Sequence, residues 1–322
     1  MLEGLPSRRK RHQEKKKDPS RFRTYSFILT IIIITVIVGA SYYQTRPTVE
    51  HIPGSFVFNP QDWMAYVPAD AEFVGYVNYA QAYAVSGNSS LFGMNVLIDL
   101  PQLGFSVIPA DLLYEVAIQL PEPQYSGAAL VLQVSAGMQS SLTGLLTSAN
   151  RTKIGEPLSY DGFKVYGLLM QELGDKSASL GYLTIVNHQI ILSNDKDSGL
   201  LNVKAILDQT ASNGESLFDN ATVRSGVYAT GVTDQSYIAL FVGRFPTQLN
   251  DTEMAAKSVI GTGGSIQVSR ALLFPSSDIA LQRWDQAHTI YRDADSYRIL
   301  DSWLVVTYNY PLTRIQAEII GI

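Results

Sequence analysis

Short apolar segments with a two-residue period occur repeatedly after residue 72. In YEVAIQL (114–120), polar and apolar positions alternate, which predicts a half-buried strand. The segment GAALVLQV (127–134) is more fully apolar and follows the turn-forming linker PEPQYS. The two segments therefore predict an antiparallel hairpin. The apolar face of the first strand carries Tyr114, Val116, Ile118 and Leu120.

The same pattern predicts further strands, and one of these segments is interrupted by a turn at Asn187 and His188. The segments are EFVGYVNY (72–79), FKVYGLLM (163–170), LGYLTIVNHQIILS (180–193), YIALFVGRF (237–245), SIQVSRALLF (265–274), IALQRW (279–284) and SWLVVTYNY (302–310).

Three segments show helical character instead. MQSSLTGLLTSAN (138–150) has leucines at helical spacing, and TEMAAKSVI (252–260) is also expected to be helical. DSGLLNVKAILDQ (197–209) predicts a helix with Asp197 or Ser198 as its N-cap. Consecutive strands interrupted by few helices favour an α+β fold, with a mainly antiparallel sheet and packed helices. Residues 213–322 are expected to be a diverged second copy of 63–212.

The segment from Thr24 to Thr45 contains no charged residue. As a helix, its 22 residues would span roughly 33 Å, enough for a bilayer core of about 30 Å. Tyrosines at both ends suit the headgroup layers. The segment therefore predicts a single transmembrane helix. The alternative is a signal peptide cleaved after Ala40, because 27–38 alone has the length of a signal-peptide core.

Residues 1–23 contain nine Lys and Arg against three acidic residues, whereas the whole chain has a net charge of −5. Basic residues beside an apolar span remain in the cytoplasm. We therefore expect a solvated basic cytoplasmic tail (1–23) that sets the orientation, a signal anchor (24–45) that contacts membrane lipid, and an acidic C-terminal region outside the cell membrane. Attraction of the tail to anionic lipid is the alternative role for these charges. The tail has one aromatic residue, Phe22, and no folded scaffold, so no nucleic-acid partner is expected.

Residues 46–62 contain three prolines and are expected to form an extended stalk, followed by the extracytoplasmic domain, 63–322. The chain has no cysteine, which excludes disulfides, lipoprotein acylation, thiol nucleophiles and cysteine-based zinc sites. The sequons predict a glycoprotein if the host has the machinery. The candidate acceptors are Asn88, Asn150, Asn220 and Asn250.

VPAD (67–70) precedes the strand at 72–79, and YDGFKVYG (160–167), YLTIVNHQIILSN (182–194) and LLNVKAILD (200–208) follow in that order. This arrangement resembles a family of exported, membrane-anchored bacterial and archaeal proteins with an α+β extracytoplasmic domain of unassigned function. The resemblance covers about 67–210 and implies an envelope location. It supplies no catalytic residues.

Known motifs for chemistry are missing from the sequence. His51, His188 and His288 have no metal-ligand spacing, and GTGGS (261–265) lacks the lysine of a phosphate loop, so it is expected to be a flexible turn. Asp195 and Asp197 lack the glycine and glutamate that a calcium loop requires, so they predict a turn and helix cap. YRDADSYR (291–298) predicts a loop with self-neutralising charges.

These features predict a non-enzymatic, single-pass surface protein without a cofactor or metal, whose outer domain binds another cell-envelope component as a structural or assembly subunit. An envelope protein is the expected partner. The alternative is an envelope hydrolase with a carboxylate site that no motif reveals. A sensory receptor is disfavoured because the cytoplasmic segment is too short for an output domain. Tyrosines and tryptophans either fill the sheet core or line a binding face. Trp63 is expected to dock the stalk on the domain.

Overall fold

The computed structural model of the protein describes residues 33–34, 47–53, 56, 61–87, 111–122, 125, 127–148, 154–171, 177–212, 214–232, 237–244 and 247–320. The chain divides into two units, 1–47 and 48–322. The predicted basic tail lies outside the described residues, as does the predicted span except Ile33 and Ile34. Across the described ranges, no helix is long and apolar enough to cross a membrane.

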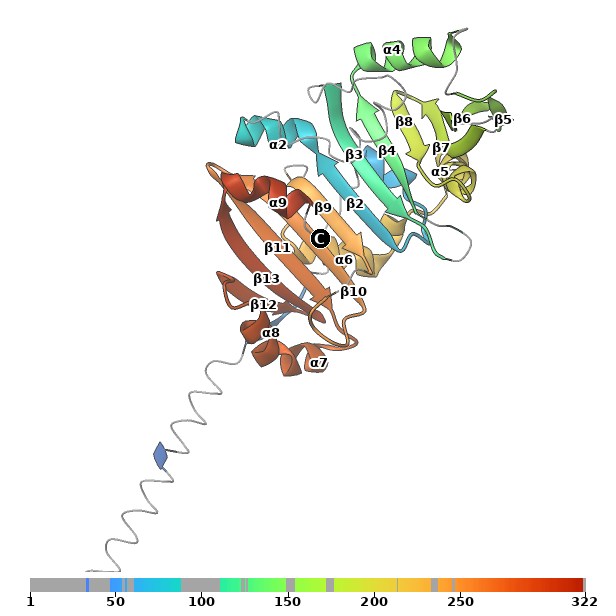
Figure 1. The fold of residues 1–322 in the computed structure, drawn as a ribbon. Helices are drawn as coiled ribbons and strands as arrows, with labels where there is room; N and C mark the ends of the chain where they lie inside the picture. The colour runs from blue at the N-terminus through green and yellow to red at the C-terminus, as the bar shows by residue number, and fades with distance from the viewer. Residues whose placement is uncertain are drawn as a thin grey trace, which may run out of the picture. The chain divides into compact units, whose positions relative to one another are not determined.

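The folded unit, 48–322, is α+β and contains one large sheet (Figure 1). Within the described residues, its 13 strands run in the order β1-β12-β13-β11-β10-β9-β2-β3-β4-β8-β7-β6-β5. Neighbours are antiparallel, except that β1 pairs with β12 in parallel. The strands are β1 (Val49–Glu50), β2 (Phe73–Asn78), β3 (Leu112–Gln119), β4 (Ala128–Val134), β5 (Leu158–Tyr160), β6 (Phe163–Gln171), β7 (Ser177–Val186), β8 (Gln189–Ser193), β9 (Tyr237–Gly243), β10 (Met254–Thr262), β11 (Ser265–Leu273), β12 (Ser296–Leu300) and β13 (Trp303–Pro311).

Helices cover both faces of this sheet, and each face has its own hydrophobic core. The first face packs against α2 (Tyr79–Ser86), α4 (Ala136–Thr147), α7 (Ser277–Gln282), α8 (Trp284–Ile290) and α9 (Ile315–Ile320), and η6 (Leu312–Arg314) precedes α9. The second face packs against η1 (Asp62–Tyr66), α5 (Gly199–Ser212), η5 (Leu217–Asp219) and α6 (Ala221–Ala229).

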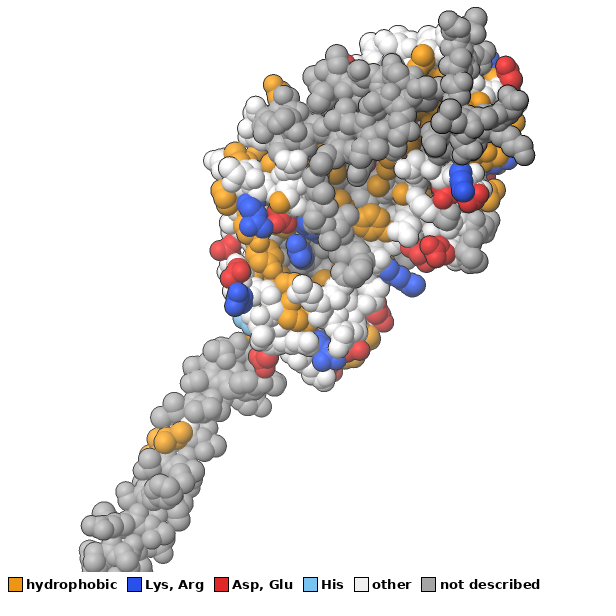
Figure 2. All heavy atoms as spheres, in the orientation of Figure 1, with side chains coloured by type: hydrophobic (Ala, Val, Ile, Leu, Met, Phe, Trp, Pro, Cys, Tyr) orange, Lys and Arg blue, Asp and Glu red, His pale blue; other side chains and the backbone are white. Residues whose placement is uncertain are grey.

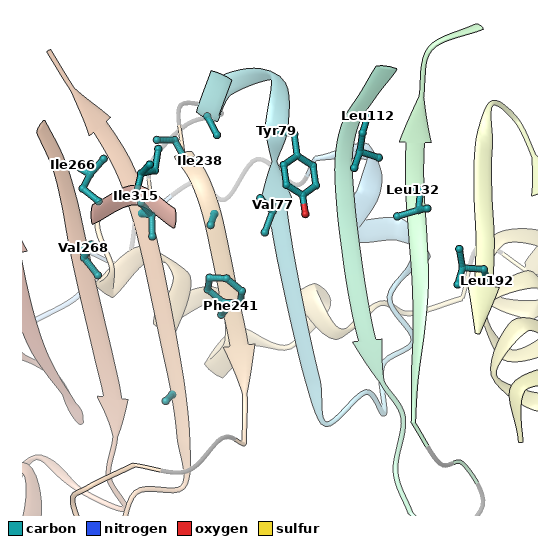
Figure 3. Close-up of a cluster of buried hydrophobic side chains, with 14 of the residues drawn as sticks. Val77, Tyr79, Leu112, Leu132, Leu192, Ile238, Phe241, Ile266, Val268 and Ile315 are labelled. Carbon is teal, nitrogen blue, oxygen red and sulfur yellow. The ribbon is translucent and has the colours of Figure 1, made fainter. Parts of the chain in front are cut away.

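Central strands are apolar on both sides because both faces are covered. All seven residues of β9 are buried. Figure 3 shows part of the first core, where Ile315 of α9 lies over the sheet near Ile266 and Ile238, and Leu132 and Leu192 continue the layer across β4 and β8. The two halves of the sheet therefore share a continuous core on this face. Basic and acidic side chains are interspersed on the molecular face that Figure 2 shows.

Most predicted elements are confirmed. The hairpin of 114–120 with 127–134 forms as β3 and β4, and the predicted helices at 138–150 and 197–209 form as α4 and α5. Asn187 and His188 form the turn between β7 and β8, both with positive φ. Residues 261–265 form the β10–β11 turn, where Gly263 and Gly264 also have positive φ.

Two predictions of local structure are wrong. Residues 252–260 were expected to be helical, but 254–262 form strand β10 between β9 and β11. Pairing on both sides overrides the helix preference of Met, Ala and Lys there. Residues 279–284 were expected to form a strand, but they lie in α7 and the start of α8. Ser276 begins α7 by accepting a hydrogen bond from the Ile279 amide.

Part of the predicted stalk joins the sheet. Val49 and Glu50 pair with Ile299 and Leu300 of β12. Immediately after them, Nδ1 of His51 lies 2.7 Å from a carboxylate oxygen of Asp301. The chain is therefore held on the edge of the folded unit from residue 49.

Lys257 of β10 is buried beneath α9. Its ammonium group donates to the backbone oxygen of Glu318 at 2.7 Å and lies 3.3 Å from the Glu318 carboxylate. Arg314 contacts the same carboxylate at 3.3 Å, and Arg270 lies 3.8 Å from it. Ile315 is buried on the same helix. The C-terminal helix is therefore fixed to the sheet by one ionic cluster and one apolar anchor.

The pH dependence of stability should reveal this buried lysine. Burial lowers the pKa of Lys257 to about 8; the Glu318 carboxylate opposes this shift, and Arg270 adds to it. Between about pH 8 and 10.5 the unfolded chain therefore holds a proton that the folded chain has lost, so the free energy of unfolding rises with pH. We expect denaturant titrations of the wild type to show this rise relative to Lys257→Met. Parallel pH profiles would contradict it, because the buried tyrosines, which lower stability above about pH 10, are common to both proteins.

Candidate functional site

Two adjoining hollows lie on the second face of the sheet, with volumes of about 480 and 400 Å³. Both are lined by Gln61, Asp62, Tyr66 and Asn187, so we treat them as one site and call it the aromatic–amide groove. The smaller hollow is also lined by Trp63, Tyr76, Tyr114, Gln133 and Gln189, and the larger by Met64, Ala65, Gln209, Thr210, Gly214, Ser216, Phe218 and Asp219.

Three neighbouring strands place a polar row in the groove. Tyr114 of β3 pairs with Gln133 of β4, and Gln133 pairs with Gln189 of β8. Residues paired directly across strands project from the same face. The apolar neighbours along these strands, such as Val131 and Ile191, are buried in the second core. The row therefore interrupts an otherwise apolar surface with one hydroxyl and two amides.

Gln189 is the most constrained member of this row, with only 3% of its surface exposed. Its Nε2 donates a hydrogen bond to the Tyr114 hydroxyl at 2.8 Å. Its Oε1 is buried and has no hydrogen-bond partner among the described residues. An unpaired buried carbonyl costs about 1–3 kcal/mol. The Gln189 side chain therefore lines the groove, while its carbonyl is enclosed at the groove floor without a hydrogen-bond donor from the described residues.

Stacked aromatic rings form the wall beside this row. Trp63 of η1 stacks on Tyr76 of β2, with ring centroids 4.5 Å apart, and meets Phe218 edge to face at 5.2 Å. Tyr76 in turn meets Tyr237 of β9 edge to face at 5.4 Å. Trp63 is 2% exposed and belongs to the second core, and its expected role in docking the stalk stays a prediction.

The segment after Trp63 is tied to the η5 region, and Trp63 itself hydrogen-bonds to the segment before it. The Trp63 indole N–H donates to Oε1 of Gln61 at 2.8 Å. The Leu217 amide donates to the backbone oxygen of Val67 at 3.2 Å, and Pro68 forms a bridge with Ser216. The groove wall is therefore built from chain segments about 150 residues apart and held by backbone contacts.

Tyrosine hydroxyls in the groove remain protonated at neutral pH. Burial raises the pKa of Tyr114 to about 12, against the opposing hydrogen bond from Gln189. Burial also raises the pKa of Tyr66 and of Tyr76. Each hydroxyl can therefore donate a hydrogen bond. Tyr114 accepts from Gln189 and keeps its own proton available for a ligand.

The residues singled out from the sequence lie in other places. Asp195 accepts from the amides of Asp197 and Ser198 at 2.9 and 2.6 Å, which confirms the predicted turn. Helix α5 begins at Gly199, and the side-chain cap by Asp197 or Ser198 stays a prediction. Among the described residues, no group of three His, Asp or Glu side chains could hold a metal ion. His188 contacts Gln139 Oε1 at 2.6 Å, and His288 stacks on Tyr297 with ring centroids 3.8 Å apart.

The predicted loop charges at 291–298 are only partly paired with one another. Arg292 lies 3.9 Å from Asp293, whereas Arg298 donates to the backbone oxygen of Ala229. Asp295 accepts from the backbone amide of Asn309 at 2.5 Å. The predicted loop is therefore only partly confirmed, because 291–295 form a turn and Ser296 to Arg298 belong to strand β12.

Of the predicted glycan acceptors, Asn220 and Asn250 are exposed, and Asn220 caps α6 by accepting from the Thr222 amide. Asn88 and Asn150 lie outside the described residues.

A second buried polar pair lies on the other face of the sheet. Glu115 is 5% exposed and accepts a hydrogen bond from the Tyr79 hydroxyl at 2.8 Å. Burial raises the pKa of Glu115, against the hydrogen bond from Tyr79. Because Glu115 follows Tyr114 along β3, its side chain points away from the groove.

Sequence reasoning did not identify the groove. Its available signal was the polar residue within each apolar strand face, namely Gln133 beyond Val131 and Gln189 before Ile191. The residues of the larger hollow come from 61–66, 187, 209–210 and 214–219, whose proximity depends on the tertiary fold.

Comparison with family models and with curated proteins gives no match. Among solved structures, crystal form IV of TP0453 aligns with 82% of this chain and 98% of its own, at 10% identity and a TM-score of 0.49. Crystal form I of TP0453 aligns with 80% of this chain and 96% of its own, at 10% identity and a TM-score of 0.48.

Proposed function

We propose that this protein is a non-enzymatic, single-pass surface protein whose outer domain binds another component of the cell envelope through the aromatic–amide groove. The observation that carries the proposal is the Gln189 side chain, which lines the groove while its enclosed carbonyl has no donor among the described residues. A ligand that turns this amide toward the hollow and donates to its carbonyl would remove the desolvation cost. The basic tail, the expected anchor and the family resemblance support a location in the cell envelope.

The hydrolase alternative would need two carboxylates acting together. Asp62 and Asp219 both line the larger hollow. Asp219, however, accepts from the Ser216 amide at 2.8 Å as part of the η5 cap. A structural hydrogen bond of this kind supports the binding proposal over the enzymatic one.

The proposal includes two related halves, 63–212 and 213–322. From the middle of the sheet outward, one half runs β2, β3, β4, β8, β7 and the other runs β9, β10, β11, β13, β12. In each half the third strand leads into helices on the first face, α4 in one and α7 with α8 in the other. The antiparallel pairing of β2 with β9 relates the halves by an approximate twofold rotation.

The absence of native cysteine permits a test with single-cysteine variants of the full chain. Ala65 is exposed at the groove and Ala317 is exposed on α9. On intact cells, a membrane-impermeant maleimide should label Ala65→Cys and Ala317→Cys, whereas Ser7→Cys should react only after lysis. A photo-crosslinking maleimide should then give an envelope adduct from Ala65→Cys and not from Ala317→Cys.

Three results would contradict the proposal in different ways. Labelling of Ser7→Cys on intact cells, with Ala65→Cys protected, would reverse the topology. Equal adduct yields from both alanine positions would remove the groove as the binding site. Turnover of an envelope polymer that is lost in Asp62→Asn would favour the hydrolase.

A further inference from the structure

The polar row of the groove has a counterpart in the other half of the sheet. In one half, β7 and β8 pair Val186 with Gln189, and the row continues to Gln133 and Tyr114. In the other half, β12 and β13 pair Leu300 with Trp303, and the row continues to Leu273 and Met254. In both hairpins, β7–β8 and β12–β13, two residues lie between the paired strand ends. The equivalent residues are therefore Gln189 with Trp303, Gln133 with Leu273, and Tyr114 with Met254.

The second half shows how an ordinary core fills this row. Trp303 is 2% exposed, and its indole N–H donates to the Ser225 hydroxyl of α6 at 3.0 Å. Gly226 of α6 admits the indole, because a Cβ there would lie 2.5 Å from it. The row is thus apolar and covered by a helix. The sheet can therefore form with apolar residues at these positions. We infer that Tyr114, Gln133 and Gln189 are polar because they line the groove.

The hydrogen-bonding groups of the row select the ligand chemistry. Gln189 Oε1 needs a donor, whereas the Tyr114 hydroxyl, which accepts from Gln189, offers a proton to an acceptor. A hydroxyl group supplies both functions at once. Gln61, Gln133 and Asn187 add further amides to the lining. The lining therefore matches a ligand with several closely spaced hydroxyls.

Charge and shape narrow the ligand further. The described lining contains Asp62 and Asp219 but neither Lys, Arg nor His, which disfavours an anion. The polar row lies on three interior strands of the sheet, so a peptide could not extend the sheet by strand addition there. The amides also make the floor unsuitable for the apolar side of a helix. Tyr66 and Tyr114 are half-buried, which leaves ring surface for an apolar sugar face.

We propose that the aromatic–amide groove binds an uncharged saccharide, with Gln189 and Tyr114 hydrogen-bonding its hydroxyls. This inference rests on the proposed function and specifies the ligand class of the same site.

The test uses the full chain in a polyoxyethylene detergent, because a sugar-headed detergent would compete for the groove. The protein is applied to arrays of neutral hexose and N-acetylhexosamine oligosaccharides, uronic-acid oligosaccharides and peptides. We expect binding to at least one neutral saccharide. Gln189→Leu and Tyr114→Phe should each weaken it about tenfold or more. Gln267→Leu is the matched control, since Gln267 is half-buried on β11, outside the groove lining, and this variant should leave affinity unchanged.

The folded state of each variant is checked by its thermal midpoint, and Tyr114→Phe keeps the ring if Gln189→Leu proves unstable. Preference for uronic acids, equal binding by all variants, or no saccharide binding would each overturn the inference. Peptide binding that depends on Gln189 would overturn the saccharide class while leaving the groove as a binding site. The Ala65→Cys adduct on cells reports separately on the proposed function.

Discussion

Gly243→Ala should lower the free energy of unfolding by about 3 kcal/mol or more. Gly243 has a φ of +147°, a conformation that a residue with a Cβ rarely adopts. An added Cβ would lie 2.6 Å from the Phe73 Cα and still closer to the Glu72 carbonyl oxygen. Both atoms belong to the backbone, so no side-chain rotation relieves the clash. The next residue extends the contact between β9 and the start of β2, since the Arg244 amide donates to the Glu72 backbone oxygen at 2.9 Å.

The clash can be separated from the effect of the positive φ alone. Gly231 also has positive φ, +84°, but a Cβ there would meet no atom within 4 Å. Gly231→Ala should therefore cost only about 1 kcal/mol. Denaturant unfolding of the full chain, followed by tryptophan fluorescence, measures both variants. If both variants lose the same small amount of unfolding free energy, β2 and β9 can move apart to admit the Cβ. That result would contradict the close backbone contact at Gly243.

Trp303→Ala should destabilise the folded unit by about 3–5 kcal/mol, because it removes a large side chain from between the sheet and α6. The lost volume lies beneath Gly226, where α6 approaches the indole closely. Ser225 would also lose the indole N–H that it now accepts. At temperatures where the variant remains folded, saccharide binding should be unchanged, because Trp303 lies outside the groove lining.

Trp284→Ala is the control for removal of an indole in the same half. Trp284 is only half-buried on α8, so Trp284→Ala should lower the free energy of unfolding by clearly less than Trp303→Ala. Thermal unfolding and saccharide titration on the same samples give both quantities. A loss of binding in folded Trp303→Ala would indicate that the second half takes part in recognition. Similar destabilisation by both tryptophan variants would contradict the packing argument.

The fold class was predictable because the strands are short apolar segments bounded by turn residues, and some of them also alternate with a two-residue period. Tyr114, Val116 and Ile118 identified β3 and its buried face correctly. Residues 254–262 were misread because Ala255, Ala256 and Lys257 favour a helix locally, and only their neighbours in the sheet decide otherwise. A lysine inside a strand becomes understandable once Glu318, 61 residues later, lies beside it.

The groove could not be predicted for a related reason. Its lining combines two short 3₁₀ helices, four strands, a turn and the end of α5, and no pair of these segments carries a recognisable motif. The sequence showed that Gln189 follows a turn, but neither its burial nor its unpaired carbonyl could be inferred without the position of Tyr114. The polar row becomes visible when the strand pairing of the two halves is compared. Equivalent positions are then polar in one half and apolar in the other, although their spacing along the strands is the same.

The two edges of the sheet determine how readily copies of this protein associate at high local concentration. A long free edge strand can pair with another copy and start a growing fibre. Here β1 has two residues and β5 has three. Beyond β5, the Gly155 amide donates to the Gly167 carbonyl at 2.8 Å, which occupies part of the β6 margin. Each end of the sheet thus offers few backbone groups to a neighbour, and dense arrays of the protein on one surface should resist polymerising edge to edge.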